Sequence, residues 1–167
     1  MSDIVEPNQP EIRTAEAPDP QAEAELQQIE QDYEASGPLV GIIMGSKNDM
    51  EKMAPAEKYL TEQGIKSETH VMSAHRDPEK VREFCMTARA RGLKVIIAGV
   101  GMSAALPGVA AATTDLPVIG VPILGKSLGG LDALLSAVQM PPGVPVACVA
   151  VDGAKNAGLL AVRIINA

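Results

Sequence analysis

Short apolar runs alternate with amphipathic stretches along most of this chain, and their order predicts a repeated strand–helix unit. The first of these runs, over residues 39–44, is continuous rather than alternating, which is typical of a parallel strand buried on both faces. Predicted strands cover residues 39–44, 66–72, 93–98, 118–121 and 146–151. Predicted helices cover residues 50–63, 78–91, 104–113, 130–139 and 154–165. Boundary residues fit this division, because Gly64 and Gly92 follow two of the helices and Pro78 opens one.

Five strand–helix units predict one α/β domain, with a doubly wound parallel sheet and helices on both faces. For this three-layer, flavodoxin-like arrangement we expect the strand order 2-1-3-4-5. In such a sheet the ligand crevice lies at the carboxyl ends of the strands, where the loops after the first and third strands diverge. The loops that follow the predicted strands therefore carry the candidate chemistry.

Polar residues and glycines gather in those loops. Residues 45–49 offer a hydroxyl, backbone N–H groups and a carboxylate at a predicted helix start, which suits a phosphate and a sugar hydroxyl. Two glycines, Gly99 and Gly101, either let the backbone approach a flat ligand closely or simply serve helix–strand packing. Residues 122–130 are glycine-rich and suited to form a lid. A fifth loop, residues 152–156, meets the same predicted edge.

One of only two histidines, His75, lies in the loop after the second predicted strand. Neutral imidazole titrates near physiological pH, so a histidine there is suited to take up and release a proton. His70 lies within the strand and is interpreted as structural. A lone histidine is more often a surface residue than a catalyst, and the gathering of polar residues at the same strand ends favours the functional interpretation. Neither a dinucleotide-binding motif nor a phosphate loop follows the first predicted strand.

Charge separates an N-terminal tail from the rest of the chain. The net charge is −7, but residues 1–37 carry −9 and the remainder carries +2. The tail is rich in Pro, Glu, Gln and Ala with little to bury, which predicts disorder through about residue 20 and a short polar helix over 21–35. The α/β domain therefore spans residues 38–167. Its near-neutral charge and few aromatic residues argue against a nucleic-acid partner.

Several other classes of protein are disfavoured by composition. No apolar run approaches the roughly 18 to 20 residues of a membrane span, and the acidic start is unlike a signal peptide. Cys85 and Cys148 sit in apolar surroundings and are interpreted as free thiols in a reducing cytosol. No histidine–cysteine cluster has metal-ligand spacing. We therefore expect a cytoplasmic protein that neither spans a membrane nor binds a metal.

An ordered set of motifs gives the domain a family resemblance. The motifs are GSKND at 45–49, SAHR at 73–76, AGVG at 98–101, LPG at 106–108, LPVIGVP at 116–122, GLDALLSAVQMP at 130–141 and NAGLLA at 156–161. Each motif alone is unspecific, but the ordered set resembles the class I aminoimidazole ribonucleotide carboxylase family over residues 39–166. The acidic tail has no counterpart in that pattern.

The resemblance implies an isomerase, an N5-carboxyaminoimidazole ribonucleotide mutase of de novo purine (IMP) biosynthesis. Such an enzyme moves a carboxylate from the exocyclic nitrogen to carbon 4 of the imidazole, with CO2 released and recaptured inside a closed pocket. The resemblance implies no metal, ATP, biotin or other cofactor. It also implies a small-molecule ribonucleotide substrate and a homo-octamer.

Matched by position, the resemblance makes His75 the acid–base residue. It places the ribose phosphate against residues of the first two loops, which are Gly45, Ser46, Asn48, Asp49, Ser73, Ala74 and Arg76. It places the imidazole and CO2 against residues of the third loop and the following helix, which are Gly99, Gly101, Ser103 and Leu106.

The third loop departs from the class I pattern, because Ala105 stands where a histidine is common. The stretch around Ser103 is closer to class II members, which carboxylate aminoimidazole ribonucleotide directly with CO2, so a direct carboxylase is the alternative. A third interpretation is a non-catalytic nucleotide- or flavin-binding module on the same fold. It is disfavoured because flavin sites usually contain stacking aromatics, and Tyr59 and Phe84 both fall within predicted helices.

Overall fold

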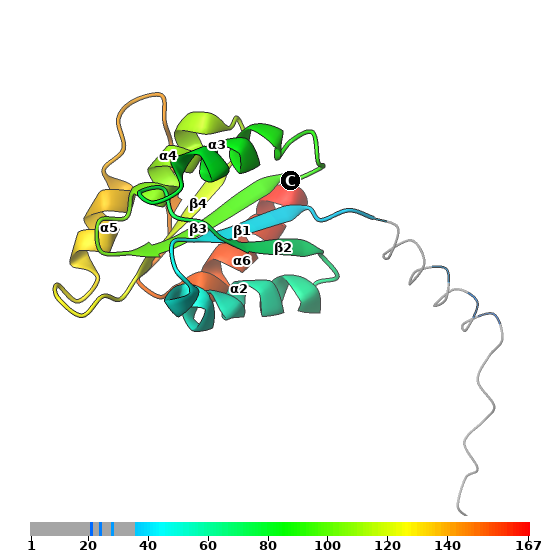
Figure 1. Ribbon diagram of the computed structural model, residues 1–167. Helices are drawn as coiled ribbons and strands as arrows, with labels where there is room; N and C mark the ends of the chain where they lie inside the picture. The colour runs from blue at the N-terminus through cyan, green and yellow to red at the C-terminus, as the bar shows by residue number, and fades with distance from the viewer. Residues whose placement is uncertain (1–20, 22–23, 25–27, 29–35) are drawn as a thin grey trace, which may run out of the picture. The chain divides into compact units, whose positions relative to one another are not determined.

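A computed structural model describes residues 21, 24, 28 and 36–167. Gln21, Ala24 and Gln28 have helical backbone, and the other residues of 1–35, which include most of the predicted acidic tail and its polar helix, lie outside the described residues. Residues 36–167 form a three-layer α/β/α unit, in which helices cover both faces of a central sheet (Figure 1). This is the flavodoxin-like fold that the apolar runs predict.

The sheet has five strands, all parallel, in the order β2-β1-β3-β4-β5. The strands are β1 (Val40–Met44), β2 (Ser67–Val71), β3 (Val95–Gly101), β4 (Val118–Ile123) and β5 (Ala147–Cys148). β1 pairs on both sides, with Val40 opposite Ser67 of β2 and Val95 of β3. The predicted strand order is confirmed, and with it the divergence of the loops after β1 and β3 at the carboxyl edge.

All five predicted helices are present. Within residues 36–167, the helical elements are the short 3-10 helix η1 (Lys47–Asp49) and the helices α2 (Met50–Glu62), α3 (Pro78–Thr87), α4 (Ala105–Thr113), α5 (Leu131–Val138) and α6 (Ala154–Ile165). Figure 1 shows α2 and α6 on one face of the sheet and α3 and α4 on the other, with α5 beside α4. Within the described part of the chain, no helix combines the length and the apolar composition that crossing a membrane requires.

The core consists of two apolar clusters, one on each face of the sheet. β1 contributes to both, because Ile42 faces α2 and α6 while Ile43 faces α3 and α4. Leu60 of α2 is fully buried in the first cluster, and Val81 of α3 is fully buried in the second. Burying a side chain of this kind stabilises the fold by about 1.5–3 kcal/mol. Because both faces of the inner strands are covered, those strands appear in the sequence as continuous apolar runs.

The second predicted helix is shorter than expected. α3 ends at Thr87 rather than at residue 91, and residues 88–92 continue as turns. Leu93 N donates to Ala88 O at 3.1 Å, which closes the chain around Gly92, whose φ is +95°. The predicted glycine stop is therefore confirmed, but the regular helix ends before it because this closing turn takes up the last residues.

The fifth predicted strand is also shorter than expected. Only Ala147 and Cys148 pair with β4, whereas the apolar run covers residues 146–151. The chain turns after Ala150, where Gly153 N donates to Ala150 O at 2.9 Å. The apolar composition of this run reflects partial burial, and it does not mark the residue at which the backbone leaves the sheet.

Candidate active site

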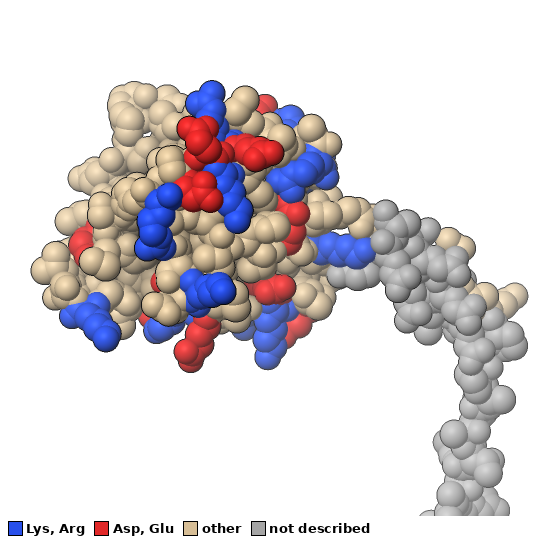
Figure 2. Space-filling view, viewed as in Figure 1, with Lys and Arg blue, Asp and Glu red and all other residues tan. Residues whose placement is uncertain are grey.

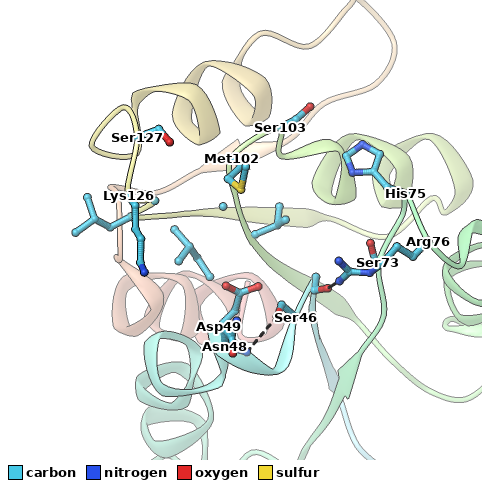
Figure 3. Close-up of a pocket in the computed structure, with 16 residues that line it drawn as sticks. Ser46, Asn48, Asp49, Ser73, His75, Arg76, Met102, Ser103, Lys126 and Ser127 are labelled. Atoms are coloured by element: carbon cyan, nitrogen blue, oxygen red, sulfur yellow. Dashed lines mark hydrogen bonds between the residues drawn. The ribbon is translucent and has the colours of Figure 1, made fainter.

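A cavity of about 670 Å³ opens at the carboxyl edge of the sheet, within the usual size range of small-molecule sites. Its walls come from the loops that follow β1, β2, β3 and β4 (Figure 3). Nine of the twelve residues that the sequence assigns to the site line this cavity. The fold therefore brings together, around one space, residues that lie up to 58 positions apart in the sequence.

The loop after β1 forms the first wall, where Gly45, Ser46, Asn48 and Asp49 line the cavity. Ser46 caps η1, because Asn48 N donates to Ser46 Oγ at 3.2 Å (Figure 3). Asp49 N also donates to Ser46 O at 3.1 Å. These two bonds fix a tight turn that presents a hydroxyl, an amide and a carboxyl group at the start of α2.

The carboxyl group of Asp49 is half-buried in this first wall. Burial raises the pKa of Asp49, and hydrogen bonding with Ser46 and the positive charge of Arg76 offset that rise only in part. A carboxyl group with a perturbed pKa in a cleft is a common feature of functional sites. When ionised, Asp49 offers hydrogen-bond acceptors of the kind that sugar hydroxyls need.

The loop after β2 forms the second wall and presents Ser73, His75 and Arg76 to the cavity. Asp77 N donates to Ser73 O at 2.9 Å and closes the turn. Arg76 Nη2 donates to Gly45 O at 2.6 Å, so a charge-assisted hydrogen bond ties the first two loops together. Figure 3 shows the His75 ring above Arg76, on the side of the cavity where Ser103 lies.

The two histidines have different surroundings. His75 is exposed at the cavity. His70 lies in β2, where its ring packs edge-on against Phe84 with 5.3 Å between the ring centroids. That packing contact fits the structural role predicted for His70. His75 is therefore the only histidine of the chain that lines the cavity.

The third wall begins at the end of β3, which extends to Gly101 and so includes both glycines of the predicted loop. Gly101 lines the cavity, but Gly99 does not. A Cβ atom at Gly99 would lie 2.2 Å from Sδ of Met53, a side chain of α2. The missing side chain at Gly99 thus makes room for helix packing, which is one of the two roles that the sequence left open.

Two more of the predicted site residues lie outside the cavity lining. Leu106 is only 1% exposed and belongs to the core cluster beneath α3 and α4, and Ala74 packs against the same cluster. Ser103 does line the cavity. So does Met102, the residue between Gly101 and Ser103, whose backbone is left-handed, with φ +59°.

The loop after β4 supplies the fourth wall, through residues that the sequence predicted only collectively as a lid. Leu124, Gly125, Lys126 and Ser127 line the cavity, and Figure 3 shows the Lys126 side chain on the side of the cavity away from His75. The sequence does carry a signal for them, since GVPILGKS at 120–127 has the spacing of a phosphate loop. Its first glycine lies inside β4, however, so only the second half of this match forms a loop.

The loop after β5 does not line the cavity but contacts the fourth wall. Asp152 Oδ1 accepts from Leu124 N at 3.0 Å, and Asp152 Oδ2 accepts from Lys52 Nζ at 2.6 Å. Burial acts to raise the pKa of Asp152, but these two hydrogen bonds and the Lys52 charge outweigh it and hold the pKa below its ordinary value. The hydrogen bond between Lys52 Nζ and Asp152 Oδ2 raises the pKa of Lys52.

The cavity combines two cations, one carboxyl group and one imidazole, carried by Arg76, Lys126, Asp49 and His75. This set suits a small ligand with anionic groups and sugar hydroxyls, held beside a residue able to move a proton. Among the described residues, no three His, Cys, Asp or Glu side chains are grouped to hold a metal ion. On the face shown in Figure 2, acidic and basic side chains of residues 36–167 are interspersed rather than separated by sign.

Fold and site together define a flavodoxin-like α/β protein with a small-molecule crevice at the carboxyl edge of its sheet. The family model described as AIR carboxylase matches residues 39–167, and the chain belongs to this family. The match therefore includes β1 and all four walls of the cavity.

Named relatives are similar over the same extent. The chain is 60% identical over 129 residues to the N5-carboxyaminoimidazole ribonucleotide mutase of Aquifex aeolicus, and the aligned residues cover 77% of each protein. It is 57% identical over 132 residues to the Bacillus subtilis protein of the same name, covering 78% of this chain and 82% of that one. A crystal structure of Treponema denticola PurE superposes with a TM-score of 0.70 at 34% identity, covering 77% of this chain and 80% of that one.

Proposed function

We infer that this chain is an N5-carboxyaminoimidazole ribonucleotide mutase, an isomerase of purine biosynthesis. The observation that carries this inference is the 60% identity over 129 residues to the Aquifex aeolicus mutase. The cavity supports it, because nine residues expected to bind the substrate or move its proton gather around a space of suitable size. The substrate is a ribonucleotide whose imidazole carries a carbamate on its exocyclic nitrogen.

The substrate's groups are matched by different walls of the cavity. Ser46 and Ser73 offer hydroxyls to the phosphate. Arg76, whose hydrogen bond to Gly45 O ties the first two loops together, offers a positive charge. Asp49 accepts hydrogen bonds from the ribose hydroxyls. The imidazole ring then lies toward the third wall, beside Gly101 and within reach of the histidine loop.

His75 performs both proton transfers in this proposal. The carbamate C–N bond breaks, CO2 leaves, and protonated His75 donates its proton to the exocyclic nitrogen, which keeps the bonding electron pair. Carbon 4 of the ring then attacks the trapped CO2 and forms the new C–C bond. Neutral His75 removes the proton from carbon 4, which restores the imidazolium and the aromatic ring. The loop after β4 limits the escape of CO2 and the entry of water.

A direct carboxylase, which would take CO2 from solution, is the second candidate. One observation favours it, because Ala105 begins α4 where class I members commonly carry a histidine. An alanine there offers no imidazole near the third wall, so the wall that handles CO2 is less polar than in the class I pattern. The phosphate-binding walls and the role of His75 are the same in both candidates.

Two assays on the purified protein separate these candidates. One supplies N5-carboxyaminoimidazole ribonucleotide without bicarbonate, and the other supplies aminoimidazole ribonucleotide with dissolved CO2. Both follow the ultraviolet absorbance of the carbon-carboxylated product. Turnover of the carbamate well above its spontaneous decay is the result expected of a mutase. Turnover with free CO2 alone would identify a direct carboxylase, and no turnover in either assay would contradict both candidates.

A cytoplasmic homo-octamer completes the proposal. An exposed apolar stripe on α5 supports self-association, because Leu131, Leu135 and Val138 are each about half exposed and follow a helical spacing. Leu128, in the preceding loop, is 63% exposed and extends the apolar surface. Contiguous exposed apolar patches on a folded protein commonly mark an interaction surface.

A further inference from the structure

Asp152 joins three parts of the fold that meet behind the fourth wall of the cavity. Its carboxylate accepts from Lys52 Nζ of α2 at 2.6 Å and from Leu124 N, at the start of the loop after β4, at 3.0 Å. Its own backbone N–H donates to Pro122 O, within β4, at 2.9 Å. Asp152 therefore holds β4 and the first residue of the cavity loop through both its backbone and its side chain.

The backbone at Asp152 adopts a conformation that few residues accept. Its φ is +56°, in the left-handed region, where aspartate and asparagine are tolerated better than most residues with a side chain. The far end of the cavity loop contacts the preceding residue, because a Cβ atom at Gly130 would lie 2.7 Å from Cγ1 of Val151. Both ends of the loop over 124–130 thus rest on Val151 and Asp152.

Between these two ends, the loop has few attachments of its own. Leu124 is 52% exposed and Leu128 is 63% exposed. Lys126 and Ser127 line the cavity, and their side chains make no hydrogen bond within the described part of the chain. The position of Lys126 over the cavity therefore depends on how firmly the ends of the loop are held.

We propose that Asp152, paired with Lys52, is a positioning residue for the carboxylate transfer. It lies outside the cavity and holds the loop over 124–127 closed across it, so that Lys126 faces the bound substrate and CO2 stays beside the ring. This proposal rests on the proposed function, since it assigns the loop the task of retaining CO2 between the two steps. Loosening the loop then lets CO2 escape, and the product becomes aminoimidazole ribonucleotide instead of its carbon-carboxylated form.

The test compares three variants with wild type. Asp152→Gly removes both side-chain bonds but accepts the left-handed backbone. Lys52→Met removes the ion pair and keeps the bond to Leu124. Asp115→Asn is the matched control, because it breaks an ion pair in which Arg89 and Asp115 are 2.8 Å apart. Asp115 lies just before β4, at the edge of the sheet away from the cavity.

The first readout is how N5-carboxyaminoimidazole ribonucleotide divides between the carboxylated product and aminoimidazole ribonucleotide. We expect Asp152→Gly to lower kcat/KM about tenfold or more and to raise the fraction lost as aminoimidazole ribonucleotide. Lys52→Met should shift the same fraction less, and added bicarbonate should partly restore the product. The proposal would be overturned by a folded Asp152→Gly variant that forms the carboxylated product and aminoimidazole ribonucleotide in the same ratio as wild type and Asp115→Asn.

The second readout is amide hydrogen exchange of the peptide that contains Leu124, and it needs no activity. We expect faster exchange in Asp152→Gly than in wild type and Asp115→Asn, because the acceptor of the Leu124 N–H is gone. Unchanged exchange would overturn the positioning role even in an inactive protein. If wild type fails to turn over the carbamate while exchange responds as expected, the proposed function fails and the structural role of Asp152 stands.

Discussion

At the scale of single residues, two carboxyl groups near the cavity have pKa values shifted in opposite directions. Burial raises the pKa of Asp49, whereas hydrogen bonds and the charge of Lys52 lower that of Asp152. Ionised Asp49 therefore destabilises the empty protein, and ionised Asp152 stabilises it. This difference fits the proposed roles, in which Asp49 meets the ligand and Asp152 holds the loop after β4.

The raised pKa of Asp49 predicts a stability gain on neutralisation. Above the folded-state pKa, Asp49→Asn should raise Tm, because it removes a charge that the fold disfavours. The gain should vanish as pH falls below the ordinary value of 3.8, where the carboxyl group is protonated in both states. The same variant should raise KM about tenfold or more through lost ribose contacts. Thermal unfolding at neutral and acid pH, with steady-state kinetics, checks both parts, and a lower Tm at neutral pH would contradict the first.

His75 is expected to act on the chemical step rather than on binding. His75→Asn keeps a polar side chain of similar reach but cannot take up and return a proton. Turnover should fall at least about 100-fold, while affinity for the ribonucleotide stays within about tenfold. Stopped-assay turnover and titration calorimetry measure the two quantities. Nearly normal turnover would rule out the acid–base role, and His70→Asn, away from the cavity, serves as the control for loss of an imidazole.

At the scale of elements, Gly99 sets how closely α2 approaches the sheet. Gly99→Ala would place a methyl group 2.2 Å from Sδ of Met53, so we expect a loss of about 1–3 kcal/mol in the free energy of unfolding. Shortening the clashing side chain, in Gly99→Ala/Met53→Ala, should make the alanine at 99 cost less than it does alone.

Urea unfolding of the single and double variants measures this coupling. Gly125→Ala is the control, because the nearest atom to a Cβ there is 3.8 Å away. It should leave the free energy of unfolding close to that of wild type. Additive effects of the two changes at Gly99 and Met53 would mean that the contact does not set the approach of α2.

The inner strands β1, β3 and β4 follow from the sequence because burial on both faces produces continuous apolar runs, whereas the edge strand β2 (SETHV) is mostly polar and only partly buried. The ends of the elements are less predictable. α3 ends before Gly92 because a turn closed by Leu93 replaces its last residues, and β5 is short because the chain bends after Ala150. Gly92 and Gly153 mark both turns in the sequence, but they do not fix the residue at which the regular helix or strand ends.

The cavity was predictable to the extent that its residues follow strands directly. Ser46 and His75 qualify, because a parallel sheet gathers the carboxyl ends of its strands at one edge. The role of Gly99 was not predictable, since it depends on Met53, a residue of a helix 46 positions earlier. Lys126 was missed as an individual residue although GVPILGKS at 120–127 has the spacing of a phosphate loop, because the first glycine of that match lies within β4 and no complete phosphate loop forms.

At the scale of the whole molecule, assembly should depend on the apolar stripe of α5. Leu135→Glu places a charge in the middle of that stripe, so we expect the proposed octamer to dissociate into smaller species. Light scattering coupled to size exclusion measures the mass. Met86→Glu is the matched control, because Met86 is 59% exposed on α3, outside the stripe. An unchanged mass for Leu135→Glu would exclude α5 from the interface.

The parallel sheet also determines where the ends of the α/β unit lie. β1 begins, and α6 finishes, at the edge of the sheet away from the cavity, and Figure 1 shows the C-terminus near the start of β1. A tag, a solid support or a fused domain attached through Ser36 or Ala167 would therefore leave the mouth of the cavity facing outward. The fold thus separates the surface by which this unit is tethered from the surface through which small molecules enter it.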